Sequence, residues 1–273
     1  MPTLDVPGAH LYYETFGRGP LLLFIQGAEG RGSVFHDVAK FLSSYYTVAC
    51  WDRRGYSLSF LVGPQELSSR MYTDADDAQR LITHLSPDAP ANVFGSSSGA
   101  VVAQHLLARH PDSVKSVIAF EPPCFTVLPQ QFASQAAGLL QQIYDTYRAR
   151  GPQTAMEIFA DTLGLPEEAH AMKSCMDSTK DDETRANTMF WFEFELLQYT
   201  SGPVPLDKLN AYQEKYIPAA GVDSGDGPTV GPVAIIAQRL GKEIVRFPGG
   251  HIGYMVRPME FAKTLREMLK PGV

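Results

Sequence analysis

Apolar residues along the chain form short continuous runs, and these alternate with longer stretches in which apolar residues recur at helical spacing. A continuous apolar run is typical of a strand that is buried on both faces of a parallel sheet. The alternation predicts an α/β fold, in which helices cover both faces of a mostly parallel central sheet. The expected strands cover residues 10–16, 21–25, 47–51, 92–94, 114–120, 216–221 and 243–247, and the expected helices cover residues 34–42, 73–85, 100–109, 230–240 and 258–269.

The pattern changes between residues 125 and 200, where expected helices follow one another without a strand between them. This segment is rich in methionine and aromatic side chains, which suit an adaptable binding surface, although any single one of them more often packs the helices against each other. We predict that residues 1–124 and 201–273 form the core and that residues 125–200 form a helical lid inserted into it. The expected lid helices cover residues 132–148, 154–163, 167–176 and 182–197.

The sequence Gly95-Ser96-Ser97-Ser98-Gly99 lies between an expected strand and an expected helix. A strand, a sharp turn of small residues and a helix form the context of a nucleophile elbow, which holds a serine hydroxyl exposed in a cleft. The glycines leave room where the two backbones approach each other, and the helix N-terminus offers free N–H groups to a developing oxyanion. We therefore predict Ser97 as a nucleophile, and an ordinary Ser/Gly-rich turn before a helix is the alternative.

A serine nucleophile needs a neighbouring base, and that base needs an acid to orient it. Of the seven histidines, His251 alone lies in a glycine-rich loop after a late strand, so it is the candidate base. Two candidate acids follow expected strands, Glu121 beside the elbow strand and Asp223 after the penultimate strand. The apolar run before Glu121 and the two prolines after it favour Glu121, but Asp223 stays open.

The stretch Gln26-Gly27-Ala28-Glu29-Gly30 follows another expected strand, and its glycines let backbone N–H groups approach a ligand closely. We predict an oxyanion hole formed by the Ser98 N–H and an N–H of the Gly27-Ala28 turn. Glu29 is a candidate substrate contact, and a solvated loop glutamate is the other interpretation. Trp191 in the lid is a second candidate substrate contact.

Five of the candidate positions in the core follow the carboxyl end of an expected strand. In a parallel α/β sheet, ligands bind beyond the carboxyl ends of the strands. We therefore expect an active site at one edge of the sheet, assembled from Gln26-Gly27, Ser97, Glu121, Asp223 and His251.

The motifs resemble those of the α/β-hydrolase superfamily over nearly the whole chain. The resemblance rests on the elbow, the Gln26-Gly27 turn, Asp52-Arg53-Arg54-Gly55-Tyr56-Ser57 and Pro248-Gly249-Gly250-His251, although the family usually has His-Gly at the turn. Within the superfamily the chain is most similar to fungal zearalenone lactonases and related actinobacterial hydrolases. There a Cys-Ser-Ser-Gly-Ala nucleophile motif and a Glu-x-Pro triad acid match Ser96–Ala100 and Glu121-Pro122-Pro123, so the resemblance implies Glu121 as the acid.

The net charge of −7 argues against nucleic acid or an anionic membrane as the main partner of this chain. The three cysteines, Cys50, Cys124 and Cys175, are scattered, which suggests neither a disulfide framework nor a metal site and fits a reducing compartment. The first residues do not have the pattern of a signal peptide, and no apolar run is long enough to span a bilayer. We expect a cytoplasmic enzyme that acts on a small molecule without a metal or cofactor, and a homodimer is compatible with this expectation.

Together these features predict a serine hydrolase that cleaves an ester or lactone of a medium-sized apolar molecule through a Ser-His-acid triad and an acyl-enzyme. The resembling fold also hosts carbon–carbon bond hydrolases, cofactor-free oxygenases, enzymes that cyclise natural products and non-catalytic ligand receptors, so these alternatives stay open. Haloalkane dehalogenases and epoxide hydrolases need an acidic nucleophile, and the serine at position 97 argues against both.

Overall fold

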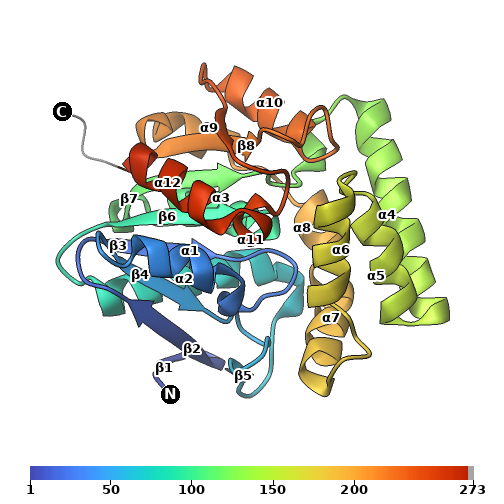
Figure 1. Ribbon diagram of the computed structural model, residues 1–273, viewed down its shortest axis with the longest axis horizontal. Coiled ribbons are helices and arrows are strands. Elements are labelled where there is room, and N and C mark those ends of the chain that lie inside the picture. The colour runs from blue at the N-terminus through green and yellow to red at the C-terminus, as the bar shows by residue number, and fades with distance from the viewer. Residues whose placement is uncertain (270–273) are drawn as a thin grey trace.

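The computed structural model describes residues 1–269, which form a nine-stranded sheet in the order β1-β2-β4-β3-β6-β7-β8-β9, with β5 paired to β2 (Figure 1). β2 pairs antiparallel with β1, β4 and β5, whereas the strands from β4 to β9 along this order pair in parallel. The mostly parallel sheet is therefore confirmed. The strands are β1 (Thr3–Val6), β2 (Ala9–Phe16), β3 (Leu21–Ile25), β4 (Thr47–Trp51), β5 (Phe60–Leu61), β6 (Ala91–Ser96), β7 (Val114–Phe120), β8 (Tyr216–Gly221) and β9 (Val245–Phe247).

Side chains of β3 alternate between two apolar cores, one on each face of the sheet. Leu22 and Phe24 belong to one core, whereas Leu21, Leu23 and Ile25 belong to the other. This double burial explains the continuous apolar run in the sequence. The first core includes residues of α1 (His36–Leu42), α11 (Gly253–Val256) and α12 (Pro258–Leu269), and the second includes residues of α2 (Arg70–Leu85), α3 (Ser98–Arg109), α9 (Leu206–Ala211) and α10 (Val230–Arg239).

The five helices between residues 130 and 201 lie together beside the sheet, as an inserted helical cap would (Figure 1). The expected continuous helix over residues 182–197 is wrong, because Glu195 has φ −131° and ψ −50° and separates two helices. The boundaries at residues 125 and 200 stay a prediction. The cap helices are α4 (Gln130–Arg150), α5 (Pro152–Asp161), α6 (Pro166–Cys175), α7 (Asp182–Phe194) and α8 (Leu196–Ser201).

Other differences from the expected elements lie at the edges of the sheet and at helix starts. The strands β1 and β5 and the short helix α9 were not expected, because their residues form no long apolar run. The last strand begins at Val245 rather than residue 243, and α2 begins at Arg70 rather than residue 73. The helix expected over residues 34–42 consists of a 3₁₀ turn, Gly32–Phe35, followed by α1.

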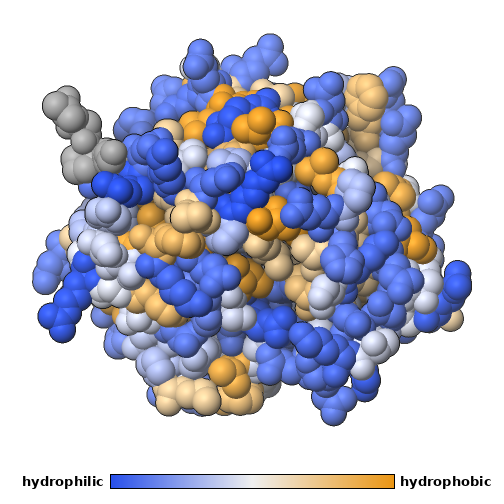
Figure 2. Space-filling model, in the orientation of Figure 1, coloured by the Kyte–Doolittle hydropathy of each residue, from blue (hydrophilic) through white to orange (hydrophobic). Residues whose placement is uncertain are grey.

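Hydrophilic side chains cover most of the face shown in Figure 2, and hydrophobic side chains appear between them in small separate areas. Within residues 1–269, no helix is both long enough and apolar enough for a bilayer span.

Candidate active site

Ser97 occupies the sharp turn between β6 and α3, with φ 56° and ψ −126°. A positive φ is unfavourable for a serine and is found where surrounding structure imposes it. A Cβ at position 95 would lie 2.4 Å from the Gly99 oxygen, and one at position 99 would lie 2.1 Å from the Ile25 oxygen. Glycine is therefore required at both positions, because the strand and helix backbones leave no room for a side chain.

Glu121 and His251 come from different strand ends and form a hydrogen bond, 2.7 Å between Glu121 Oε2 and His251 Nδ1. The Glu121 carboxylate also accepts hydrogen bonds from the Gly221 N–H at 2.9 Å and the Thr229 hydroxyl at 2.7 Å, as well as from the Ser224 hydroxyl. Burial alone would raise the pKa of Glu121, but the hydrogen bond and charge of His251, with the two hydroxyl donors, lower it to about 2. The carboxylate therefore stays ionised beside the imidazole at neutral pH.

Asp223, the alternative acid, makes no hydrogen bond or ion pair with His251 within residues 1–269. Its carboxylate pairs with Arg257 at 3.3 Å, where both side chains are partly exposed. Because Glu121 bonds Nδ1, the Nε2 atom of His251 is the nitrogen left for a substrate or for Ser97. The geometry thus places Glu121, and not Asp223, in the position of an orienting acid.

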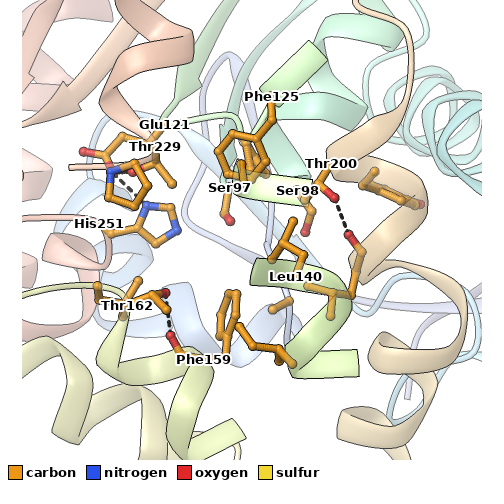
Figure 3. A pocket seen from close by; sticks show the side chains of 18 of the residues that line it. Ser97, Ser98, Glu121, Phe125, Leu140, Phe159, Thr162, Thr200, Thr229 and His251 are labelled. Carbon is orange, nitrogen blue, oxygen red and sulfur yellow. Dashed lines mark hydrogen bonds and ion pairs between the residues drawn. The ribbon is translucent and has the colours of Figure 1, made fainter. Parts of the chain in front are cut away.

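Ser97 and His251 line one cavity, which has an empty volume of about 910 Å³ (Figure 3). Trp191, only 3 % exposed, lines the same cavity from α7. No hydrogen bond joins Ser97 Oγ to the imidazole among the described residues, and such contacts often shorten only when substrate binds. Apolar side chains form much of the remaining wall, including Phe125, Leu139, Leu140, Ile143, Phe159, Leu163 and Leu196.

The turn after β3 approaches Ser97 closely. A Cβ at Gly27 would lie 2.9 Å from Ser97 Cβ, so a side chain at this position would collide with the elbow. The Gln26 carboxamide ties the turn to the sheet by donating to the carbonyl oxygens of Gly30 at 2.6 Å and Trp51 at 2.5 Å. Gln26 therefore stabilises the turn although the family usually has histidine there.

Two backbone N–H groups are available beside the nucleophile. Ala28 and Ser98 line the cavity with Ser97, and Ser98 is the first residue of α3, so its N–H has no acceptor within the helix. Gly27 lines a smaller neighbouring cavity instead. This arrangement offers Ala28 and Ser98 as the pair of donors for an oxyanion.

Glu29 is buried rather than solvated, so the interpretation of an ordinary solvated loop glutamate is wrong. Its side chain is 7 % exposed and lines the smaller cavity beside Ser97 and His251. Burial raises the pKa of the carboxyl above its ordinary value, while Cys175 and Arg31 act in the opposite direction.

Glu195 joins the cap to the core at the break between α7 and α8. Its carboxylate accepts hydrogen bonds from Arg53 at 2.7 Å, from the Ser98 hydroxyl at 2.5 Å and from the Tyr56 hydroxyl. Glu195 is not among the candidates predicted from the sequence, where its one signal is a carboxylate within an aromatic and apolar stretch, Trp191–Leu197.

Glu168 of α6 supports the loop that carries His251. It accepts hydrogen bonds from the Gly250 N–H at 2.6 Å and the Ile252 N–H at 3.1 Å, one on each side of the histidine. Glu168 is not among the predicted candidates either, because acids in the first turn after Pro166 are typical of any helix start.

The chain matches a known protein family along most of its length. A family model for the alpha/beta hydrolase fold matches residues 20–229, and the chain therefore belongs to this family. The chain is 32 % identical to the uncharacterized hydrolase YraK of Bacillus subtilis (strain 168) over 270 aligned residues. The alignment covers 98 % of this chain and 95 % of YraK. The superfamily resemblance is thus confirmed, and the coarse class is a hydrolase of the α/β-hydrolase fold.

Solved structures share the fold at low sequence identity. A thermophilic esterase from Thermogutta terrifontis has a TM-score of 0.76 at 18 % identity, covering 99 % of this chain and 98 % of that one. An enol-lactonase from Burkholderia xenovorans LB400 has a TM-score of 0.72 at 18 % identity, covering 99 % and 100 %. At this identity the likeness establishes the fold alone, and the narrower resemblance to zearalenone lactonases stays a prediction.

Proposed function

We propose that this protein is a serine esterase or lactonase that cleaves a medium-sized, largely apolar ester through Ser97, His251 and Glu121. The observation that carries the proposal is the 2.7 Å hydrogen bond between Glu121 and His251 Nδ1, beside a cavity that Ser97 also lines. An acid that orients a histidine toward a serine is the arrangement that activates a hydroxyl nucleophile. The many apolar side chains in the cavity wall support an apolar substrate.

In the proposed reaction, Glu121 accepts a hydrogen bond from the Nδ1–H group of His251. This bond keeps the imidazole in the tautomer whose Nε2 can accept a proton. Ser97 Oγ attacks the ester carbonyl carbon while Nε2 takes the hydroxyl proton. The resulting oxyanion accepts hydrogen bonds from the Ala28 and Ser98 N–H groups, each contributing roughly 3 kcal/mol in the transition state.

The acyl-enzyme then forms and breaks down by steps that use the same groups. The carbonyl re-forms, the bond to the alcohol oxygen breaks, and His251 gives its proton to that oxygen. A water molecule next loses a proton to His251 and attacks the acyl carbon, which releases the carboxylic acid and returns the proton to Ser97. The esterase and the enol-lactonase that share the fold support a substrate with an ester bond.

A fluorophosphonate probe tests the proposal, because it reacts with an activated serine. We expect rapid labelling of Ser97, identified by peptide mass spectrometry, and loss of labelling in Ser97→Ala and His251→Ala proteins that remain folded. The same variants should lose turnover of aryl esters and lactones. Full esterase activity in Ser97→Ala, or folded wild-type protein that is neither labelled nor active on either substrate class, would contradict the proposal.

A further inference from the structure

Two cavities meet at the nucleophile. The larger cavity and a smaller one, with an empty volume of about 390 Å³, share Ala28, Ser97, Phe159 and His251 as lining residues. An ester extends in two directions from its carbonyl carbon, and only a short arm suits the smaller cavity. The smaller cavity contains the Glu29 carboxyl, which the larger one does not.

Glu29 lacks the hydrogen bonds that a buried carboxyl normally has. Its side chain is 7 % exposed, and within residues 1–269 neither carboxyl oxygen accepts a hydrogen bond from an N–H or O–H group. Among the described residues, the one side-chain donor near the carboxyl is the Cys175 thiol, a weak donor that also lies 3.6 Å from the Met172 carbonyl oxygen. The guanidinium of Arg31 instead contacts Glu183 at 3.6 Å and the Cys175 carbonyl oxygen at 3.5 Å.

The other buried glutamates around the site show that this absence is unusual. Glu121 accepts four hydrogen bonds, Glu195 accepts three, and Glu168 accepts two from backbone N–H groups. A buried polar group without a partner is unfavourable, and such a group beside a reactive centre is explained when a ligand completes its hydrogen bonds.

We propose that Glu29 forms a polar subsite that binds a hydroxyl group on the shorter arm of the ester substrate. A hydroxyl suits this place because it donates to a carboxylate and accepts from a carboxylic acid, so it satisfies Glu29 in either protonation state. The inference rests on the proposed ester hydrolysis at Ser97 and adds the class of substrate: an ester with one long apolar arm and one short hydroxylated arm.

Two pairs of esters of nearly equal shape test this subsite. In the first pair, 2-hydroxyethyl octanoate has a hydroxyl on the alcohol side where propyl octanoate has a methyl group. In the second pair, octyl hydroxyacetate has a hydroxyl on the acyl side where octyl propanoate has a methyl group. The kcat/KM ratio within each pair is measured for wild type and Glu29→Met, so that the intrinsic reactivity of the esters cancels. Glu183→Gln is the matched control, since it removes an acid from Arg31 outside the cavities.

In one of the two pairs, we expect the preference of wild type for the hydroxylated ester to fall about tenfold or more in Glu29→Met. Glu183→Gln should keep the wild-type preference. If Glu29→Met does not fold, Glu29→Gln, which keeps the shape, should lower the preference by about threefold or more.

Failure of this inference is distinguishable from failure of the proposed function. Ser97-dependent hydrolysis with the same preference in wild type and the Glu29 variants would overturn the subsite and leave the esterase proposal standing. No hydrolysis of any of the four esters, together with no fluorophosphonate labelling of Ser97, would overturn the proposed function itself.

Discussion

At the scale of single residues, two backbone positions in the candidate site are held at unfavourable torsion angles. Ser97 has φ 56° and Glu121 has φ 48°, and neither is glycine. Each is tied to the neighbouring strand by its own N–H, Ser97 to the Phe120 oxygen at 2.9 Å and Glu121 to the Ala219 oxygen at 3.0 Å. The adjoining strand ends therefore impose the geometry that directs the two side chains toward the site.

The role of the acid is tested by a pair of amide substitutions. We expect Glu121→Gln to lower kcat/KM for an ester about 10³- to 10⁴-fold, because the carboxamide no longer stabilises the imidazolium and can hold the wrong tautomer. Asp223→Asn should stay within about threefold of wild type, since it loses only a partly exposed ion pair with Arg257. The reverse ranking would make Asp223 the acid.

At the scale of elements, α6 of the cap supports the loop that carries His251. The Glu168 carboxylate bonds the N–H groups on both sides of the histidine, and burial raises the pKa of this carboxyl although those bonds act in the opposite direction. The cap helix is therefore a structural support for the candidate base, and its Met172 lines the smaller of the two cavities beside Ser97.

Removal of this support should weaken both the fold and the site. In Glu168→Ala two N–H groups lose their acceptor, so we expect the free energy of unfolding in urea to fall by about 2–4 kcal/mol. We also expect Ser97 to react with a fluorophosphonate about tenfold more slowly under conditions where the variant is fully folded, since the base is less well positioned. The neighbouring exposed residue supplies the control, and a Glu167→Ala protein with the same losses would contradict this explanation.

At the scale of the whole molecule, a buried ionic network joins the cap to the core. The Arg53 guanidinium, fully buried, pairs with Asp74 of α2 at 2.9 Å and with Glu195 at the α7–α8 break at 2.7 Å. Glu195 also accepts the Ser98 hydroxyl, next to the nucleophile. The position of the cap is thus linked to the elbow through charges that are shielded from solvent.

Loss of Glu195 should therefore affect the whole structure. Glu195→Ala leaves the buried Arg53 with one acidic partner fewer, and we expect a loss of about 3 kcal/mol or more in the free energy of unfolding, measured in urea. Glu193→Ala, two residues earlier, removes a partly exposed pair with Arg148 and the hydrogen bonds from the Tyr144 and Tyr147 hydroxyls, and should lose about 1–2 kcal/mol. If the two variants lost the same free energy of unfolding, the buried pair between Glu195 and Arg53 would not stabilise the protein more than an exposed pair does.

The strand and helix pattern was predictable because burial on both faces of the sheet requires continuous apolar runs, as in β3. The elbow was predictable because Gly95 and Gly99 are needed where two backbones touch. The break at Glu195 was not predictable, because residues 182–197 have helical spacing throughout and the break follows from contacts with Arg53 and Ser98 across the fold.

The sequence by itself determined the fold class and the short list of candidate residues, since these depend on local periodicity and on motifs of a few residues. The tertiary structure alone decided which acid faces His251, whether Glu29 is solvated or buried, and how Glu168 and Glu195 support the site. Glu121 and His251 are 130 residues apart, and Glu195 and Ser98 are 97 apart. Such pairs form only when separate strand ends and cap helices pack together, and a pattern of a few neighbouring residues cannot predict that packing.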